Sequence, residues 1–456
     1  MRIGLINPRG AYVATNPWMK KFMEDHPSSF RSWMIPNLGL LTIAGMTPTE
    51  IAVDYIDENF GTVDFAADYD LVALSGMTQQ VCRAYEIAAV FRSRGVYTAI
   101  GGPHATVMAE EARKHVDTVV VGEAEGVWEQ FLADFRRSRS QRTYVNDRLE
   151  KVDLSKSPVP RYDLIPGAFY FPSADYKMIP VQTTRGCPRH CDFCSVPQVY
   201  GKAFRVKNVS QVIADVEEAK SVANGLLILF SDDNMFINRR FSKELLKALI
   251  PLKIRYMAQS DIGIGKDEEL LRLMYESGCV MVLIGLESLS FENLKKVDRF
   301  KAKMLERYSE YVRRIQSFGI AVLGAFILGF DHDDLLTFQR IADFVLENSI
   351  YPQVTIATPL PRTALTDRLS REGRLPQSSY WNRCTYYDAV FEPRGMTREQ
   401  LERGVAALHE LLMSSEVTSQ RRSYFKTAMR GLKERGLCRW PEPALQRPVQ
   451  YGLSVL

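Results

Sequence analysis

Thr184-Arg185-Gly186-Cys187-Pro188-Arg189-His190-Cys191-Asp192-Phe193-Cys194 is the stretch around which this chain is organised, because it holds three thiols within eight residues. Cysteines at the spacing Cys-x3-Cys-x2-Cys can face one point from a short loop. A closed zinc or cubane iron–sulfur site uses four protein ligands. We therefore expect Cys187, Cys191 and Cys194 to hold a metal centre with one open position. The alternative is a closed zinc site or three structural thiols, with His190 as the nearest fourth ligand.

The segments that follow predict a partial barrel. From Ile179 to Pro359 six apolar runs alternate with helix-like segments, which is typical of βα units. The runs are Ile179–Thr184, Leu226–Phe230, Ile254–Gln259, Val280–Leu286, Ile320–Leu328 and Gln353–Thr358. Six units form an open (βα)6 barrel, and the cysteine loop follows its first strand. Ligands of such barrels bind at the carboxyl ends of the strands.

Polar residues stand at those predicted strand ends. Asp232 and Asp233 follow the second run, Gln259 and Ser260 end the third, and Glu287 ends the fourth. Carboxylate and amide oxygens there are suitable acceptors for a cationic ligand with hydroxyl groups. The alternative for any one of these carboxylates is a helix N-cap or a rim charge.

The first 140 residues predict a separate, doubly wound α/β domain. Short apolar runs at Arg2–Ile6, Ala52–Ile56, Leu71–Ser75, Tyr97–Ile100 and Thr118–Val121 alternate with helical periodicity. Ligands of such sheets bind at the carboxyl ends of the strands. The residues that this rule selects are Ser75, Thr78, Gly101, Gly102, His104, Gly122 and Glu123. The dinucleotide motif G-x-G-x-x-G is absent, so nucleotide binding by that route is not supported.

Composition and charge bound the remaining possibilities. We divide the 456 residues into the α/β domain (1–140), a proline-rich linker (141–177), the barrel (178–374) and a mainly helical extension (375–456) with a helix near Thr397–Ser414. The formal charge of +4 does not indicate a nucleic-acid partner. No apolar run reaches the length that spans a bilayer, so we expect a cytoplasmic protein without a transmembrane segment. Seven cysteines, three of them clustered, do not suggest a disulfide framework.

The cysteine loop resembles that of the radical S-adenosylmethionine (SAM) superfamily, whose Cys-x3-Cys-x2-Cys loop holds a [4Fe–4S] cluster with one free iron. The aromatic residue before the last cysteine, here Phe193, is also typical of that family. The α/β half resembles the cobalamin-binding (B12-binding) domain of one group within it. The matching stretches are Pro36-Asn37-Leu38-Gly39-Leu40-Leu41, Asp57-Glu58-Asn59 and Val121-Gly122-Glu123-Ala124-Glu125.

The resemblance implies the cofactors and their sites. It implies a [4Fe–4S] cluster on the three cysteines. SAM would lie near Phe193 and the strand-end residues Asp232, Asp233, Gln259, Ser260 and Glu287. Cobalamin would lie at the loops that carry Ser75, Thr78, Gly101, Gly102, His104, Gly122 and Glu123. The Asp-x-His-x-x-Gly motif of the cobalamin-dependent mutases is absent, which implies cobalamin without a protein histidine on cobalt. A degenerate domain that binds nothing is the alternative.

The resemblance also implies an activity. A 5′-deoxyadenosyl radical would activate an unactivated carbon, which would then receive a methyl group from methylcobalamin, as in hopanoid, bacteriochlorophyll and antibiotic C-methylases. The alternatives are a non-methylating radical enzyme, such as a cyclase or a carbon–carbon coupling enzyme, and a non-catalytic cobalamin or iron–sulfur sensor. The expected partners are a small-molecule, lipid or tetrapyrrole substrate and an electron donor such as flavodoxin or ferredoxin. The sequence selects neither the substrate nor a catalytic acid or base.

Overall fold

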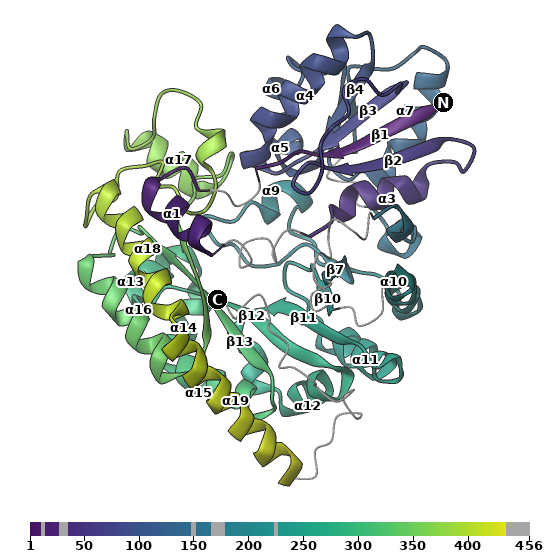
Figure 1. The fold of residues 1–456 in the computed structure, drawn as a ribbon. Helices are drawn as coiled ribbons and strands as arrows, with labels where there is room; N and C mark the ends of the chain where they lie inside the picture. The colour runs from purple at the N-terminus through teal and green to yellow at the C-terminus, as the bar shows by residue number, and fades with distance from the viewer. Residues whose placement is uncertain (11–13, 27–34, 147–151, 166–177, 223–226, 435–456) are drawn as a thin grey trace.

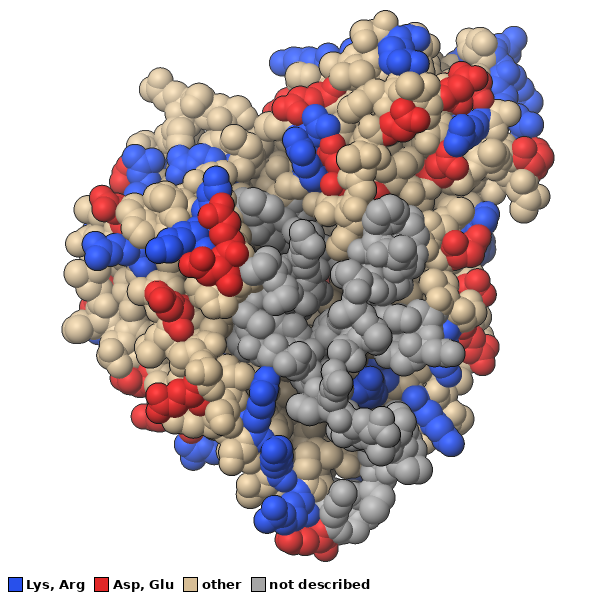
Figure 2. Space-filling view, viewed as in Figure 1, with Lys and Arg blue, Asp and Glu red and all other residues tan. Residues whose placement is uncertain are grey.

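The computed structural model describes residues 1–10, 14–26, 35–146, 152–165, 178–222 and 227–434. Two parallel sheets, each of six strands, dominate the molecule, and each carries its own helices (Figure 1). None of the helices in these ranges has the length and apolar content required to cross a membrane. Basic and acidic side chains are interspersed over the described part of the face in Figure 2.

The first sheet confirms the predicted doubly wound domain. Its strand order is β2-β1-β3-β4-β5-β6. The strands are β1 Arg2–Asn7, β2 Ala52–Asp57, β3 Leu71–Ser75, β4 Tyr97–Gly101, β5 Thr118–Val121 and β6 Thr143–Val145, and the helices are α3 Leu38–Met46, α4 Val81–Ser93, α5 Gly102–Val107, α6 Ala109–Ala112 and α7 Trp128–Arg136. The sixth strand was not predicted, because three residues with one buried side chain are too short for a periodic signal. The sheet therefore continues past residue 140 into the predicted linker, of which 147–151 and 166–177 lie outside the described residues.

The second sheet is the predicted six-stranded partial barrel, ordered β14-β13-β12-β11-β10-β7. Its strands are β7 Met178–Val181, β10 Leu227–Phe230, β11 Arg255–Ser260, β12 Cys279–Glu287, β13 Ala321–Leu328 and β14 Tyr351–Ile356. Its helices are α10 Val209–Val222, α11 Arg239–Leu249, α12 Glu268–Ser277, α13 Phe291–Val297, α14 Arg299–Met304, α15 Tyr308–Ser317, α16 Leu335–Glu347 and α17 Ala364–Arg371. The end strands β7 and β14 do not pair among the described residues, so the barrel stays open.

The cysteine loop leaves the barrel differently from the prediction. The first apolar run is not one strand to Thr184: β7 ends at Val181, and β8 Thr184–Arg185 pairs antiparallel with β9 Arg205–Val206. This hairpin and the short helix α9 Val196–Tyr200 frame the three cysteines. Protein elements therefore hold the loop from both sides.

Helix α1 (Pro17–Asp25) packs against α18 (Arg398–Met413) and the inner face of the barrel. Met19 and Phe22 of α1 join a buried apolar cluster whose other members include Met257, Met281 and Leu323 from the strands. The fully buried carboxylate of Asp388 accepts hydrogen bonds from both Thr15 and Asn16, at 2.7 Å from the Asn16 amide. This N-terminal segment thus joins the extension, which continues into α19 Ser415–Glu434.

A buried histidine gives the protein an acid-sensitive contact. Nε2 of His409 donates a hydrogen bond to the Val354 carbonyl at 2.8 Å, and burial lowers the pKa of this histidine to about 4. Since the unfolded chain binds the proton from near pH 6.5 downwards, the folded state loses stability as the pH falls from 6.5 to 4. The loss attributable to His409 is about 3 kcal/mol.

We expect His409→Gln, whose amide can still donate to Val354, to remove this part of the acid sensitivity. Urea unfolding at about pH 7 and about pH 4.5 measures it as the difference between wild type and variant. His332→Gln is the control, because His332 is exposed. An equal acid dependence in wild type and His409→Gln would contradict the assignment.

Candidate active site

The three cysteines lie on one loop between β8 and α9 and are half-buried and free of disulfides. Burial raises the pKa of all three thiols, and that of Cys194 to about 12. They are therefore neutral until iron displaces the protons. His190, the candidate fourth ligand, is exposed. No group of three His, Cys, Asp or Glu side chains within the described ranges is placed to hold a single metal ion. Three thiolates without a fourth protein ligand fit a cubane cluster with one open iron.

Asp232 and Asp233 accept hydrogen bonds from the residues that lead into this loop. The Asp232 carboxylate accepts hydrogen bonds from the backbone and hydroxyl groups of Thr183 and Thr184, with the Thr183 amide at 2.9 Å. Asp233 accepts one from the Gly186 amide at 3.0 Å. Burial raises the pKa of both carboxyls to about 6 against these donors. The contacts give both residues a structural role in the loop, and their contact with SAM stays a prediction.

The predicted SAM residues on the next two strands have contrasting surroundings. Gln259 is exposed, and its amide donates to the Asp233 carbonyl at 3.3 Å. Ser260 is buried and donates to Asn234 at 3.3 Å. Gln259 therefore keeps an accessible side chain at the barrel mouth, whereas the hydroxyl of Ser260 is directed into the protein. Their roles toward SAM stay predictions.

Glu287 forms a buried ion pair with Lys301, which sequence reasoning did not select. The lysine also donates to the Gly285 carbonyl at 2.9 Å. Burial opposes the charge on Lys301, but the Glu287 carboxylate outweighs it and raises the pKa of the lysine. Glu287 has φ +64°, a left-handed backbone conformation that side chains other than glycine rarely adopt. The pair joins the end of β12 to helix α14. Both charges act on the Cys191 thiol, whose pKa Lys301 lowers and Glu287 raises.

Phe193 and its neighbour Asp192 fix the other side of the loop. The Phe193 ring lies 6.2 Å from the ring of Phe330, which follows β13. Asp192 pairs with Arg368 at 3.4 Å, and Arg368 also pairs with Asp331 at 2.6 Å. The cysteine loop is thus tied to the far strands of the barrel as well as to the near ones.

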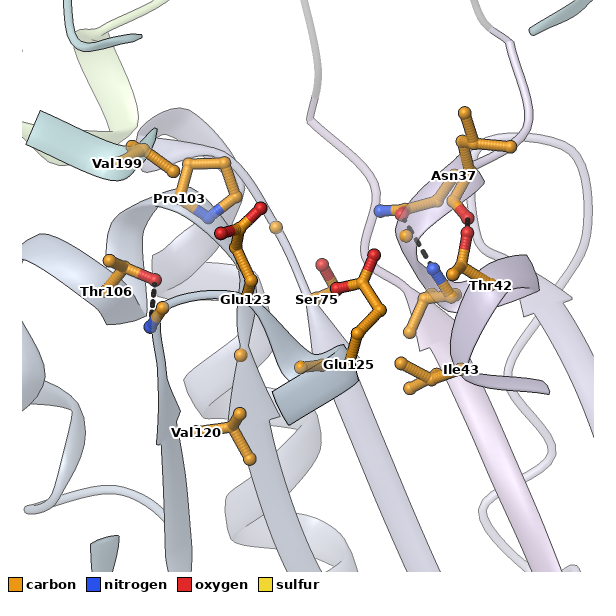
Figure 3. A pocket seen from close by; sticks show the side chains of 18 of the residues that line it. Asn37, Thr42, Ile43, Ser75, Pro103, Thr106, Val120, Glu123, Glu125 and Val199 are labelled. Atoms are coloured by element: carbon orange, nitrogen blue, oxygen red, sulfur yellow. Dashed lines mark hydrogen bonds between the residues drawn. The ribbon is translucent and has the colours of Figure 1, made fainter. Parts of the chain in front are cut away.

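A cavity of about 400 Å³ lies between the two sheets, at the carboxyl ends of the first. Figure 3 shows Glu123 and Glu125 extending from the loop after β5, and Ser75 at the end of β3. Of the predicted cobalamin residues, the ones that line it are Ser75, Gly101, Gly102, Gly122 and Glu123. The structure brings these together from three strand ends.

Thr78 and His104 do not line this cavity. His104 is fully buried, with its ring nitrogens 3.3 Å from the Thr78 hydroxyl and 3.4 Å from a Glu111 oxygen. Glu111 also accepts from Trp381 at 3.0 Å. In the described structure both residues thus belong to the contact between the α/β domain and the extension. The structure offers no support for either as a cobalamin contact.

The lining of the cavity fits a large ligand held by backbone and small side chains. Gly102 has φ +89°, and a Cβ there would lie 2.7 Å from the Ser75 hydroxyl, so this loop admits only glycine. Thr106 accepts a hydrogen bond from the Gly122 amide at 3.1 Å and holds the third loop in place (Figure 3). Glycines and small side chains among apolar residues suit the amide-fringed, apolar corrin ring.

Several lining residues were not selected from the sequence. The α/β domain adds Asn37, which lies in the Pro36-Asn37 motif, and Trp128. The barrel side contributes Gln182, Arg185, Val199, Tyr200 and Ser231. The motif was a usable signal for Asn37. Nothing local marks the barrel residues, because only the packing of the two domains brings them to the cavity.

Comparisons with known proteins agree with this geometry. The Radical SAM superfamily model matches residues 181–345, and the B12 binding domain model matches residues 34–132. Bacteriochlorophyllide d C-12(1)-methyltransferase from Chlorobaculum tepidum is 30% identical over 395 residues, which cover 84% of this chain and 85% of that protein. The chain belongs to the cobalamin-binding group of radical SAM enzymes.

Another relative and two solved structures also resemble this radical SAM enzyme. Hopanoid C-2 methylase from Rhodopseudomonas palustris is 31% identical, covering 75% of this chain and 65% of that protein. The solved structure of the radical SAM methyltransferase TsrM from Kitasatospora setae, with cobalamin and a [4Fe–4S] cluster bound, has a TM-score of 0.65 at 13% identity and covers 94% of this chain and 99% of that chain. The cobalamin-dependent enzyme OxsB scores 0.66 at 15% identity over 96% of this chain and 71% of that chain. At such identities these structures support the fold.

Proposed function

We propose that this enzyme transfers a methyl group to an unactivated carbon of an apolar small molecule. The observation that carries the proposal is the cavity, which is lined by the α/β domain on one side and by residues next to the cysteine loop on the other. Arg185, two residues before Cys187, is one of those lining residues. Residues of both domains would therefore hold the corrin, next to the loop that would hold the cluster, which supports one substrate site for both cofactors.

The chain's own residues provide binding, orientation and exclusion of water. Cys187, Cys191 and Cys194 would hold the cluster, and the loops with Ser75, Gly101 and Gly122 would hold the corrin. When bound, the cluster with SAM supplies a 5′-deoxyadenosyl radical, and cobalamin supplies a transferable methyl group. Gln259 and Glu287 are the proposed polar contacts to SAM, and Phe193 is the proposed aromatic contact.

The substrate class follows from the interior of the barrel. Met257, Met281, Leu323 and the α1 residues Met19 and Phe22 form an apolar inner cluster. A lipid or a tetrapyrrole suits this surface better than a charged peptide. The related proteins are named for methylation of a hopanoid and of a bacteriochlorophyllide, both extended apolar ring systems. The electron donor proposed is a low-potential protein such as flavodoxin or ferredoxin.

Product analysis tests the proposal. After anaerobic reconstitution with iron, sulfide and hydroxocobalamin, and with SAM and dithionite added, we expect both 5′-deoxyadenosine and S-adenosylhomocysteine. The second product should require hydroxocobalamin, and protein reconstituted without it is the control. Formation of 5′-deoxyadenosine alone would favour the second candidate, a non-methylating radical enzyme. If neither product forms, the result would favour a non-catalytic sensor.

A further inference from the structure

Arg185 connects the two domains at the wall of the cavity. It lies on β8 of the barrel domain and its side chain is only 9% exposed. Its Nη1 lies 2.5 Å from Glu123, and its Nη2 lies 2.8 Å from Glu125. Both glutamates belong to the loop after β5 in the α/β domain and line the cavity. One guanidinium therefore holds two carboxylates that belong to the other domain.

Further contacts orient this guanidinium. Gln182 accepts from Nε at 3.1 Å and from Nη2 at 2.9 Å. The ring of Tyr200, on α9, lies 5.6 Å from the guanidinium carbon. Arg205, on the paired strand β9, binds Glu123 at 2.7 Å. We call Arg185, Arg205, Glu123 and Glu125 the interdomain ion-pair network, which contains two positive and two negative charges.

Burial makes the network expensive to break. A charge left unpaired in such a site costs about 3–5 kcal/mol. Arginine is suited to the central position because its planar fork can bind two carboxylates at once, whereas lysine is a single point charge. The network thus constrains the relative orientation of the two domains as well as the distance between them.

The backbone carries this constraint to the cluster ligands. Gly186 follows Arg185, has φ +89°, and a Cβ there would lie 2.3 Å from the Ala203 carbonyl. The Gly186 amide is bound by Asp233, and Cys187 is the next residue. The segment between the guanidinium and the first thiol is therefore short and closely packed, so a shift at Arg185 moves Cys187.

We propose that Arg185 is a positioning residue that sets the placement of the cysteine loop relative to the cobalamin cavity. This inference rests on the proposed function, because placement matters only if both cofactors act on one SAM and one substrate. Reductive cleavage of SAM needs the barrel alone. Methyl transfer from SAM to reduced cobalamin, which leaves S-adenosylhomocysteine, needs both domains in register.

The test compares Arg185→Met and Arg185→Lys with wild type in reconstituted holoenzyme. With SAM and dithionite but no substrate, we expect S-adenosylhomocysteine formation to fall about 10- to 100-fold in Arg185→Met, because a small misplacement of reacting groups costs this much. Cleavage to 5′-deoxyadenosine, iron content and the electron paramagnetic resonance signal of the cluster should stay close to wild type. Arg185→Lys, which keeps the charge, should lie between the two.

Calorimetry of the same proteins before reconstitution is an independent readout. Arg185→Met should unfold in two separated transitions, one for each domain, where wild type unfolds in one. Arg83→Gln is the matched control. This variant loses a partly buried ion pair with Glu58, and both residues of that pair lie within the α/β domain. It should keep the wild-type product ratio and a single transition.

Two results would overturn the inference. One is a parallel fall of both products in Arg185→Met, which would indicate a general loss of structure. The other is behaviour identical to Arg83→Gln in both the product ratio and calorimetry. If wild type itself forms no S-adenosylhomocysteine, the proposed function fails, and the calorimetric comparison still decides whether Arg185 joins the domains.

Discussion

Replacing Cys191 by alanine is expected to abolish reductive cleavage of SAM. The loop supplies only three thiols, and the exposed His190 offers no substitute, so two remaining cysteines would not hold a [4Fe–4S] cluster. Activity should fall by more than about 100-fold, since even partners outside the ligand shell contribute about 10- to 100-fold. Iron and sulfide content, the visible absorbance of the reconstituted protein and 5′-deoxyadenosine formation measure the effect.

Cys82→Ala is the matched control for this experiment. Cys82 is also a half-buried free thiol, but it lies on α4 of the α/β domain. It should keep wild-type iron content and activity. A Cys191→Ala protein that retains a full cluster and cleaves SAM would show that the cluster lies elsewhere.

Lys301→Met is expected to destabilise the protein by about 3–5 kcal/mol, because it leaves the Glu287 carboxylate buried without its partner. Glu287→Met should cost a similar amount by leaving the ammonium unpaired. The double variant Glu287→Met/Lys301→Met should recover most of the loss, since apolar replacement of a whole buried pair is often neutral. Urea unfolding of the three variants measures these free energies. A Lys301→Met protein as stable as wild type would contradict the pairing.

The same double variant separates stability from cofactor binding at Glu287. If Glu287 contacts SAM, the stable double variant should still bind SAM about 10-fold more weakly, the value of one hydrogen bond to a charged group. Equilibrium dialysis against SAM measures this affinity. Wild-type affinity in the stable double variant would limit Glu287 to its ion pair with Lys301.

The strands show how far periodicity reaches in this chain. The runs at Leu71–Ser75 and Thr118–Val121 were predicted with their observed bounds, because buried parallel strands are continuous apolar runs. The helix expected near Thr397–Ser414 is α18, with Thr397 and Ser414 as its caps. The hairpin β8–β9 was not predicted, because its two strands have two residues each and no alternation.

The candidate site divides in the same way. Ser75, Gly101 and Gly122 were found because each ends or directly follows a strand, and a parallel sheet brings its strand ends together. Thr78 and His104, which the same rule selected, do not line the cavity, because the chain turns away after Met77 and Pro103 and the buried ring of His104 lies between the Thr78 hydroxyl and Glu111. A position near a strand end does not determine the direction of a side chain.

The sequence by itself determined the fold of both domains and the family, and it predicted the metal ligands, since these depend on spacing and periodicity along a continuous segment. Only the tertiary structure decided the partners of the charged residues. Arg185 forms ion pairs with Glu123 and Glu125, which lie 62 and 60 residues earlier in the chain, and Glu287 at the end of β12 pairs with Lys301 on helix α14. Such pairs depend on how two surfaces dock, and docking is set by packing over many side chains. The cysteine loop could therefore be identified from the sequence, whereas its connection to the cavity between the two sheets could be identified only from the folded protein.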